Sequence, residues 1–238
     1  MATEGFSRTP SIWGGILAAF VLIHGGGSSA WDWHLVRPLL EVSGHEVIAV
    51  DLPIEDKTAG LEDYVHAVTA AVGDVQHTIV VGHSLGGFTA PLVCDKLHSD
   101  GLIYLAGMIP SPGETFTDWW TNTGHDLETI DPDTQASFFN NVPEELMHQA
   151  LAKGRDQQGE WMARPWPGRR HPAVPTRAIL CRDDQFFPAS FMKRQVLQRL
   201  GIEPVEIPGG HYATLSNPDA VAKTLIDFAQ TIAMTPGN

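Results

Sequence analysis

One short stretch constrains the fold of this chain more than any other, the segment 78–87 with the sequence TIVVGHSLGG. Its first four residues are β-branched and predict a buried strand, whereas 88–97 has the length and apolar pattern of a helix. Between them, residues 82–86 fit the pattern G-x-S-x-G. A serine on a sharp strand-to-helix turn has strained dihedrals, and side chains two residues before or after it would clash with the backbone. The stretch therefore predicts a strand–turn–helix unit that exposes the Ser84 hydroxyl, and its flanks disfavour the alternative of a chance Gly/Ser loop.

The rest of the chain alternates between predicted strands and helices. Strands are expected at 19–23, 46–52, 101–106, 177–181 and 204–207, and helices at 33–42, 61–75, 189–200 and 219–233. Such alternation implies right-handed βαβ units, and hence a mainly parallel central sheet with helices on both faces. Pro91 falls early in the helix 88–97 and is expected to distort it. The expected fold class is α/β.

The segment 108–173 interrupts this alternation and is rich in prolines, acidic residues and tryptophans. We predict an inserted helical cap here, between the two parts of the core, 1–107 and 174–238, with residues 1–12 partly disordered. The cap aromatics Trp119, Trp120, Phe138 and Trp161 are candidates for a substrate pocket. Packing of the cap onto the core is the alternative for each of them.

Composition excludes several classes of function. The formal net charge of −13 argues against nucleic-acid and anionic-membrane partners, because both require a basic surface. The two cysteines, Cys94 and Cys181, fall in a predicted helix and a predicted strand and are expected in the core, and no Cys/His spacing resembles a zinc site. The apolar run 12–23 is too short to span a bilayer. We therefore expect a soluble, cytoplasmic protein without metal or cofactor, and the sequence leaves a homodimer open.

The order of three residue types along the chain indicates nucleophilic catalysis. A serine needs an adjacent base to attack at neutral pH. An acidic pair, Asp183 and Asp184, follows the strand 177–181, and His211 lies on a glycine-flanked loop after the last strand. Carboxyl ends of parallel strands meet at one edge of a sheet, so these residues are expected to lie at the same edge.

The glycine-rich loop 24–29 lacks the lysine of a phosphate-binding loop, so nucleotide binding is disfavoured.

Several short motifs together resemble the α/β-hydrolase superfamily, and within it the branch of small plant-type methylesterases and hydroxynitrile lyases with their bacterial relatives. The resemblance covers roughly residues 20–228. The motifs are His24-Gly25-Gly26-Gly27, Trp31-Asp32-Trp33, Gly44-His45, Asp51-Leu52-Pro53, Gly82-His83-Ser84-Leu85-Gly86-Gly87, Asp184-Gln185-Phe186-Phe187-Pro188 and Gly210-His211.

This resemblance implies catalytic roles by position. Ser84 would be the nucleophile and His211 the general base and then acid. Asp184 would orient His211, since the family's aspartate stands four residues before a proline, as Asp184 does before Pro188. Asp183 is the rival, with a turn or loop contact as its other role.

The resemblance also implies where substrate charge and substrate groups would lie. The oxyanion hole would consist of the backbone N–H groups of Gly26 and Leu85. Gly25, His83 and Tyr212 are further candidates for the substrate pocket. His83 and His24 are also expected to make structural hydrogen bonds.

The predicted function is that of a serine hydrolase that cleaves a small carboxylic ester through an acyl-enzyme. The alternatives are a hydroxynitrile lyase or a carbon–carbon hydrolase on the same fold, and a ligand-binding, receptor-like protein with little turnover. Hydroxynitrile lyases of this branch carry threonine and lysine where Gly25 and Tyr212 stand here, which favours the ester. Epoxide and haloalkane hydrolases are disfavoured, because they carry aspartate in place of Ser84.

Overall fold

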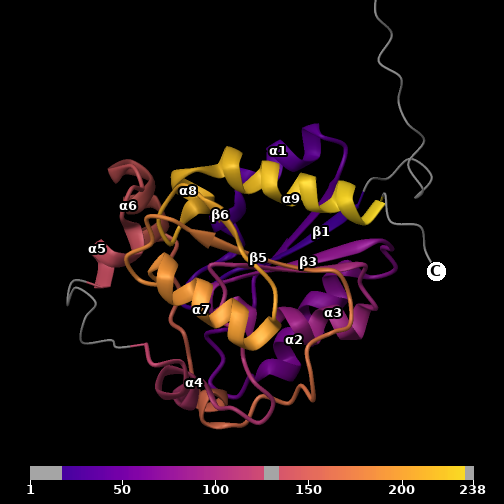
Figure 1. Ribbon diagram of the computed structural model, residues 1–238, viewed down its shortest axis with the longest axis vertical. Coiled ribbons are helices and arrows are strands. Elements are labelled where there is room, and N and C mark those ends of the chain that lie inside the picture. The colour runs from indigo at the N-terminus through magenta and orange to yellow at the C-terminus, as the bar shows by residue number, and fades with distance from the viewer. Residues whose placement is uncertain (1–17, 126–133, 234–238) are drawn as a thin grey trace, which may run out of the picture.

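The computed structural model describes residues 18–125 and 134–233, and their centre is a sheet of six parallel strands (Figure 1). The strand order across the sheet is β2-β1-β3-β4-β5-β6. The strands are β1 (Ala19–Ile23), β2 (Glu46–Val50), β3 (Thr78–His83), β4 (Gly101–Leu105), β5 (Thr176–Cys181) and β6 (Val205–Ile207). The central strands β1, β3 and β4 are buried along their whole length, as continuous apolar runs in a parallel sheet require.

Helices cover both faces of this sheet (Figure 1). One face carries α1 (Val36–Val42) and α9 (Pro218–Ala233). The other carries α2 (Leu61–Val72), α3 (Ala90–Leu97) and α7 (Ala189–Leu200). Alternate strand residues enter the two layers: Val80 belongs to the hydrophobic cluster of α2, α3 and α7, whereas Val81 belongs to that of α1 and α9. The predicted fold class, with helices on both faces, is therefore confirmed.

Two helices, α1 and α3, begin later than predicted, and each has a proline in its first turn. The helix predicted at 33–42 is a 3-10 turn, η1 (Ala30–Trp33), followed by α1, which starts at Val36. The helix predicted at 88–97 starts only at Ala90, after the 3-10 turn η2 (Ser84–Gly87). Pro38 and Pro91 thus lie in the first turn of their helices, where a missing N–H breaks no hydrogen bond. Pro91 marks the start of a helix and does not distort an existing one.

The register of the sheet brings four loops to one edge. Ile23 pairs with Gly82, and Leu105 pairs with both His83 and Ile179. Cys181 pairs with Ile207 at the ends of β5 and β6. The loops after β1, β3, β5 and β6 therefore emerge side by side, and a short helix that the sequence did not predict, α8 (Ala213–Ser216), follows the last of them.

The chain between β4 and β5 contains short helices, described here except for residues 126–133. They are α4 (Phe116–Thr123), α5 (Thr134–Phe139), α6 (Glu144–Ala152) and the 3-10 turn η4 (Glu160–Ala163). The cap boundaries 108 and 173 stay a prediction. The disorder expected at residues 1–12 lies outside the described residues.

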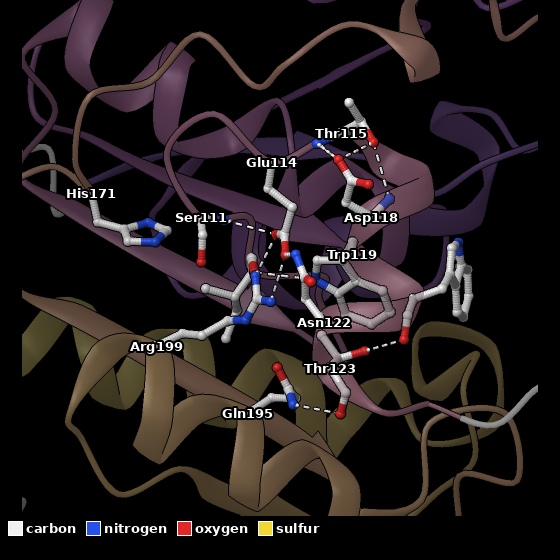
Figure 2. A network of polar contacts seen from close by, with 12 residues as sticks. Ser111, Glu114, Thr115, Asp118, Trp119, Asn122, Thr123, His171, Gln195 and Arg199 are labelled. Carbon is white, nitrogen blue, oxygen red and sulfur yellow. Dashed lines mark hydrogen bonds and ion pairs between the residues drawn. The ribbon is translucent and has the colours of Figure 1, made fainter.

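A buried ion pair ties the start of this segment to α7 (Figure 2). Both carboxylate oxygens of Glu114 accept hydrogen bonds from the guanidinium of Arg199, at 2.5 and 2.8 Å. The Ser111 backbone N–H and the Asn122 amide donate to the same carboxylate, each at 2.9 Å, and Arg199 also donates to the Ile109 carbonyl. The Glu114 side chain is only 3% exposed and that of Arg199 only 10%. This cluster fixes residues 109–122 against the core helix.

Within residues 18–125 and 134–233, no helix is long and apolar enough to cross a membrane.

Candidate active site

The turn after β3 holds Ser84 in a strained conformation that its glycine neighbours make accessible. Ser84 has a φ of +50°, in the left-handed region that non-glycine residues rarely adopt. A Cβ on Gly82 would lie 2.7 Å from the Cβ of Ala90, and one on Gly86 would lie 2.6 Å from the His24 carbonyl oxygen. Only glycine fits at these two positions, so the sharp turn predicted for the G-x-S-x-G pattern has a direct steric cause.

Three side chains from three loops form a continuous series of hydrogen bonds. The Ser84 hydroxyl lies 2.9 Å from Nε2 of His211, and Nδ1 of His211 lies 2.9 Å from Oδ2 of Asp184. All three residues are buried, at 7% exposure or less. With Nδ1–H donating to the carboxylate, Nε2 is free to accept the hydroxyl proton of Ser84. The arrangement can activate the serine and stabilise the imidazolium that forms.

The two neighbouring aspartates have different partners. Oδ1 of Asp184 accepts hydrogen bonds from the backbone N–H groups of Phe186 and Phe187, both at 2.8 Å, which orients Oδ2 toward His211. Asp183 instead accepts a hydrogen bond from the Gly209 N–H at 3.1 Å, and its side chain is 40% exposed. Asp184 is therefore the acid in contact with the imidazole, whereas Asp183 fixes the loop that precedes it.

Two further histidines, both neutral, hold the loops around Ser84 in place. Burial lowers the pKa of His24 to about 4 and that of His83 to about 3. Nε2 of His24 accepts from the Leu52 N–H, so its Nδ1–H donates to the Gly25 carbonyl. Nε2–H of His83 donates to the backbone carbonyl of His211 at 3.0 Å. Both residues make the structural hydrogen bonds expected of them.

The glycine-rich loop after β1 lies against Ser84. A Cβ on Gly25 would be 3.0 Å from the Cβ of Ser84, and one on Gly26 would be 3.0 Å from Cδ2 of Leu85. Leu85 is in the first turn of η2, where backbone N–H groups have no partner within the helix. The two candidate oxyanion-hole residues, Gly26 and Leu85, are therefore neighbours beside the serine.

The structure separates the predicted pocket aromatics into two groups. The ring of Phe138 stacks on Phe186 at 4.0 Å and meets the His211 ring edge-on at 5.2 Å. Trp120 is half-buried and packs on the rings of Phe186 and Phe187. Phe138 and Tyr212 also line a cavity of about 160 Å³.

Trp119 and Trp161 instead pack the inserted segment onto the core. They are 1% and 4% exposed, and their indole N–H groups donate to the Ile109 carbonyl and the Tyr64 hydroxyl. These contacts fit the alternative role, packing, and a pocket role for either residue stays a prediction.

Sequence reasoning missed three residues that contact the glycine-rich loop. The Arg155 N–H donates to the Gly27 carbonyl at 2.9 Å, and Oε1 of Gln157 lies 3.4 Å from the Gly27 N–H. No local pattern indicates these contacts, because they join segments far apart in the chain. The buried carboxyl of Asp32 did have a signal, since a charged residue stands between two tryptophans in an otherwise apolar motif.

No group of three or more histidine, cysteine, aspartate or glutamate side chains suited to a metal ion occurs in the described parts of the chain.

The parallel sheet, the strained serine and the Ser84–His211–Asp184 series define the class, an α/β hydrolase. A model of the Alpha/beta hydrolase family matches residues 20–224. The chain belongs to this family.

Three relatives show how far the similarity extends. Norfluorocurarine synthase 2 of a Strychnos species is 27% identical over 90% of this chain and 96% of its own length. Polyneuridine aldehyde esterase of Rauvolfia serpentina is 26% identical over 89% of this chain and 96% of its own length. A crystal structure of polyneuridine aldehyde esterase has a TM-score of 0.77 at 25% identity, and covers 89% of this chain and 99% of its own. Methylesterase 7 of Arabidopsis thaliana is 25% identical over 90% of this chain and 97% of its own length.

These similarities confirm the predicted methylesterase-like branch and an enzyme of the esterase type. The name of the Strychnos relative, a synthase, leaves the particular reaction to be argued from the site.

Proposed function

We propose that this protein hydrolyses a small carboxylic ester through an acyl-enzyme. The observation that carries the proposal is the hydrogen-bonded series from the Ser84 hydroxyl through His211 to the buried Asp184 carboxylate. It supports Ser84 as the nucleophile, His211 as general base and acid, and Asp184 as the group that fixes the imidazole tautomer.

In the first half of the reaction, His211 takes the Ser84 proton at Nε2 while Oγ attacks the ester carbonyl. Negative charge develops on the carbonyl oxygen, where the N–H groups of Gly26 and Leu85 would donate hydrogen bonds. The imidazolium then gives its proton to the leaving alcohol. In the second half, His211 deprotonates a water molecule that releases the acid and restores Ser84.

The surroundings of Ser84 support a small substrate with a neutral reacting group. The cavity beside the glycine-rich loop has a volume of about 160 Å³, and Phe138 forms part of its wall. His24 and His83 stay neutral at physiological pH because burial lowers their pKa to about 4 and about 3. A neutral ester carbonyl needs no fixed cation until the oxyanion forms, and the backbone N–H groups serve that stage.

The test is a burst experiment with p-nitrophenyl acetate. The protein should release p-nitrophenol in a burst stoichiometric with active sites, followed by slower steady turnover. Ser84→Ala should abolish the burst and lower kcat by about a million-fold, the loss measured for the nucleophile of another serine hydrolase. Ser43→Ala is the matched control, because that hydroxyl donates to the Leu39 carbonyl at the end of α1, far from the site, and should leave the burst unchanged. Near-normal turnover by Ser84→Ala would refute the proposal.

The other predicted activities and properties remain open. A receptor-like protein would bind the ester without a burst. A carbon–carbon hydrolase with the same triad would still be acylated by this activated ester, so a carbon–carbon substrate is needed to identify it. The homodimer and the cytoplasmic location stay predictions.

A further inference from the structure

A small cavity beside the glycine-rich loop carries a buried carboxyl group that the proposed chemistry does not use. Asp32, Ser28, Gly26 and Tyr212 are among the residues that line this cavity of about 160 Å³. Asp32 is only 4% exposed, and the Ser28 hydroxyl donates a hydrogen bond to its Oδ2. A carboxylate has about four acceptor positions, so the bond from Ser28 leaves capacity for a further donor.

The carboxyl group is energetically unfavourable where it lies. Burial raises the pKa of Asp32 to about 7, against the lowering effect of Ser28, and the nearby Asp51 acts in the same direction as burial. A buried carboxylate destabilises the fold unless hydrogen bonds replace its hydration. An additional donor from a bound molecule would complete that replacement.

The position of the cavity associates it with the alcohol half of an ester. Tyr212 directly follows His211 in the chain, and the Phe138 ring lies 5.2 Å from the imidazole. Both side chains line the cavity. His211 must give its proton to the leaving oxygen, so the alcohol half departs from beside the imidazole, and Phe138 and Tyr212, which line the cavity, both lie beside that ring.

The walls of the cavity define the chemistry of the group that it would take. Phe138, Phe139 and Leu151 contribute apolar surface, whereas Asp32 is a hydrogen-bond acceptor. Lys153 also lines the cavity, and its positive charge offsets the attraction of Asp32 for a cationic group. These features favour a short chain with a neutral hydroxyl.

We propose that this cavity is a subsite for the alcohol half of the substrate, and that Asp32 accepts a hydrogen bond from a hydroxyl group on that half. The inference rests on the proposed ester hydrolysis and adds the class of ester to it, the monoester of a short diol or polyol.

Three acetate esters of nearly equal shape test the proposal. The alcohol halves are 3-hydroxybutyl, 3-methylbutyl and 2-(dimethylamino)ethyl. The first two carry a hydroxyl or a methyl on the third carbon from the ester oxygen, and the third has a protonated amine in place of that carbon. At pH 8, where the Asp32 carboxyl is ionised, we expect kcat/KM for the hydroxyl ester to exceed that for the methyl ester by about tenfold or more, since hydrogen bonds to charged groups are the stronger class. The ratio of the two values does not depend on how much of a preparation is folded.

Two substitutions remove the acceptor, Asp32→Ala by leaving space and Asp32→Leu by filling it. Both should reduce the ratio to about one, whereas Asp32→Asn keeps an amide oxygen and should retain part of the preference. Asp74→Asn is the control, because Asp74 is an exposed carboxylate in the turn after α2 and has no place in the cavity. It should leave the ratio unchanged.

The outcomes distinguish failure of this inference from failure of the proposed ester hydrolysis. A Ser84-dependent burst with p-nitrophenyl acetate, together with a ratio near one or a ratio unaffected by Asp32→Ala and Asp32→Leu, would overturn the subsite alone. Preference for the dimethylamino ester over the hydroxyl ester would overturn the assignment of a neutral hydroxyl. Absence of Ser84-dependent turnover on every ester would overturn both the proposed function and this inference.

Discussion

The buried ion pair between Glu114 and Arg199 should contribute several times more stability than an exposed pair of similar length. Arg199→Met keeps most of the side-chain stem but leaves the Glu114 carboxylate, 3% exposed, without its cation. Removing one partner of a buried pair typically lowers the free energy of unfolding by about 3–5 kcal/mol. The control is Arg37→Met, since Arg37 and Glu41 are 2.7 Å apart and their side chains are 50% and 46% exposed. That change should alter the free energy by about 0.5 kcal/mol or less.

The direction in which a second substitution changes the stability tests whether the uncompensated Glu114 charge is the cause. Glu114→Gln removes the charge but keeps an oxygen for the Ser111 N–H, so adding it to Arg199→Met should recover part of the lost stability. Burial alone would raise the pKa of Glu114, but hydrogen bonds from Arg199, Asn122 and Ser111 lower it overall. Its contribution to stability is therefore present above the ordinary glutamate pKa of about 4.3 and is lost as pH falls through the lowered value. The effect of Arg199→Met should diminish in that acidic range.

Urea unfolding at several pH values measures all of these quantities, with the slope m checked for constancy among variants. The reasoning would be refuted if Arg199→Met destabilised the protein no more than Arg37→Met does. A double variant less stable than Arg199→Met alone would also refute it.

Two further predictions concern carboxyl groups near the site. Asp184→Asn should lower kcat by up to about ten-thousand-fold through loss of the correct imidazole tautomer, whereas Asp183→Asn should be mild; steady-state kinetics on p-nitrophenyl acetate checks this, and the reverse ranking would make Asp183 the acid of the triad. Asp32→Asn should stabilise the protein increasingly between about pH 4 and pH 7, because a carboxyl whose pKa is raised from 3.8 to about 7 on folding opposes folding as it ionises. The full pKa shift corresponds to about 4 kcal/mol in the free energy of unfolding. Urea unfolding at pH 5 and pH 8 measures the difference in this free energy between Asp32→Asn and the parent protein. Equal differences at the two pH values would contradict the prediction.

The elements that position the site were predictable because local sequence determines them. Buried parallel strands require continuous apolar runs, so β1, β3 and β4 were evident from segments such as Phe20–Ile23 and Thr78–Val81. Ser84 and His211 stand on glycine-flanked loops directly after predicted strands, and this position alone predicts that they lie at one edge of the sheet. The starts of α1 and α3 lie later than predicted, because Pro38 and Pro91 each belong in the first turn of a helix.

Contacts between distant segments left no comparable signal. Glu114 and Arg199 are 85 residues apart, and nothing in either segment indicates the other. The same holds for Arg155 and Gln157, whose hydrogen bonds to Gly27 depend on how the chain returns from α6. Burial of Trp119 and Trp161 likewise follows from tertiary packing, since an aromatic residue in a predicted cap fits either a pocket or a core.

The environment of Ser84 also bears on the lyase alternative. Cyanide leaving a cyanohydrin carries a full negative charge, and in a partly dry pocket an uncompensated anion costs several kcal/mol. Gly25 offers no side-chain hydroxyl, and burial raises the pKa of the Tyr212 phenol, with the nearby Asp32 acting in the same direction, so that this residue stays neutral. His83 is neutral as well, since burial lowers its pKa to about 3. We therefore expect no cleavage of mandelonitrile above background under conditions where p-nitrophenyl acetate is hydrolysed. Benzaldehyde release that Ser84→Ala abolishes, with the ester left intact, would establish the lyase instead.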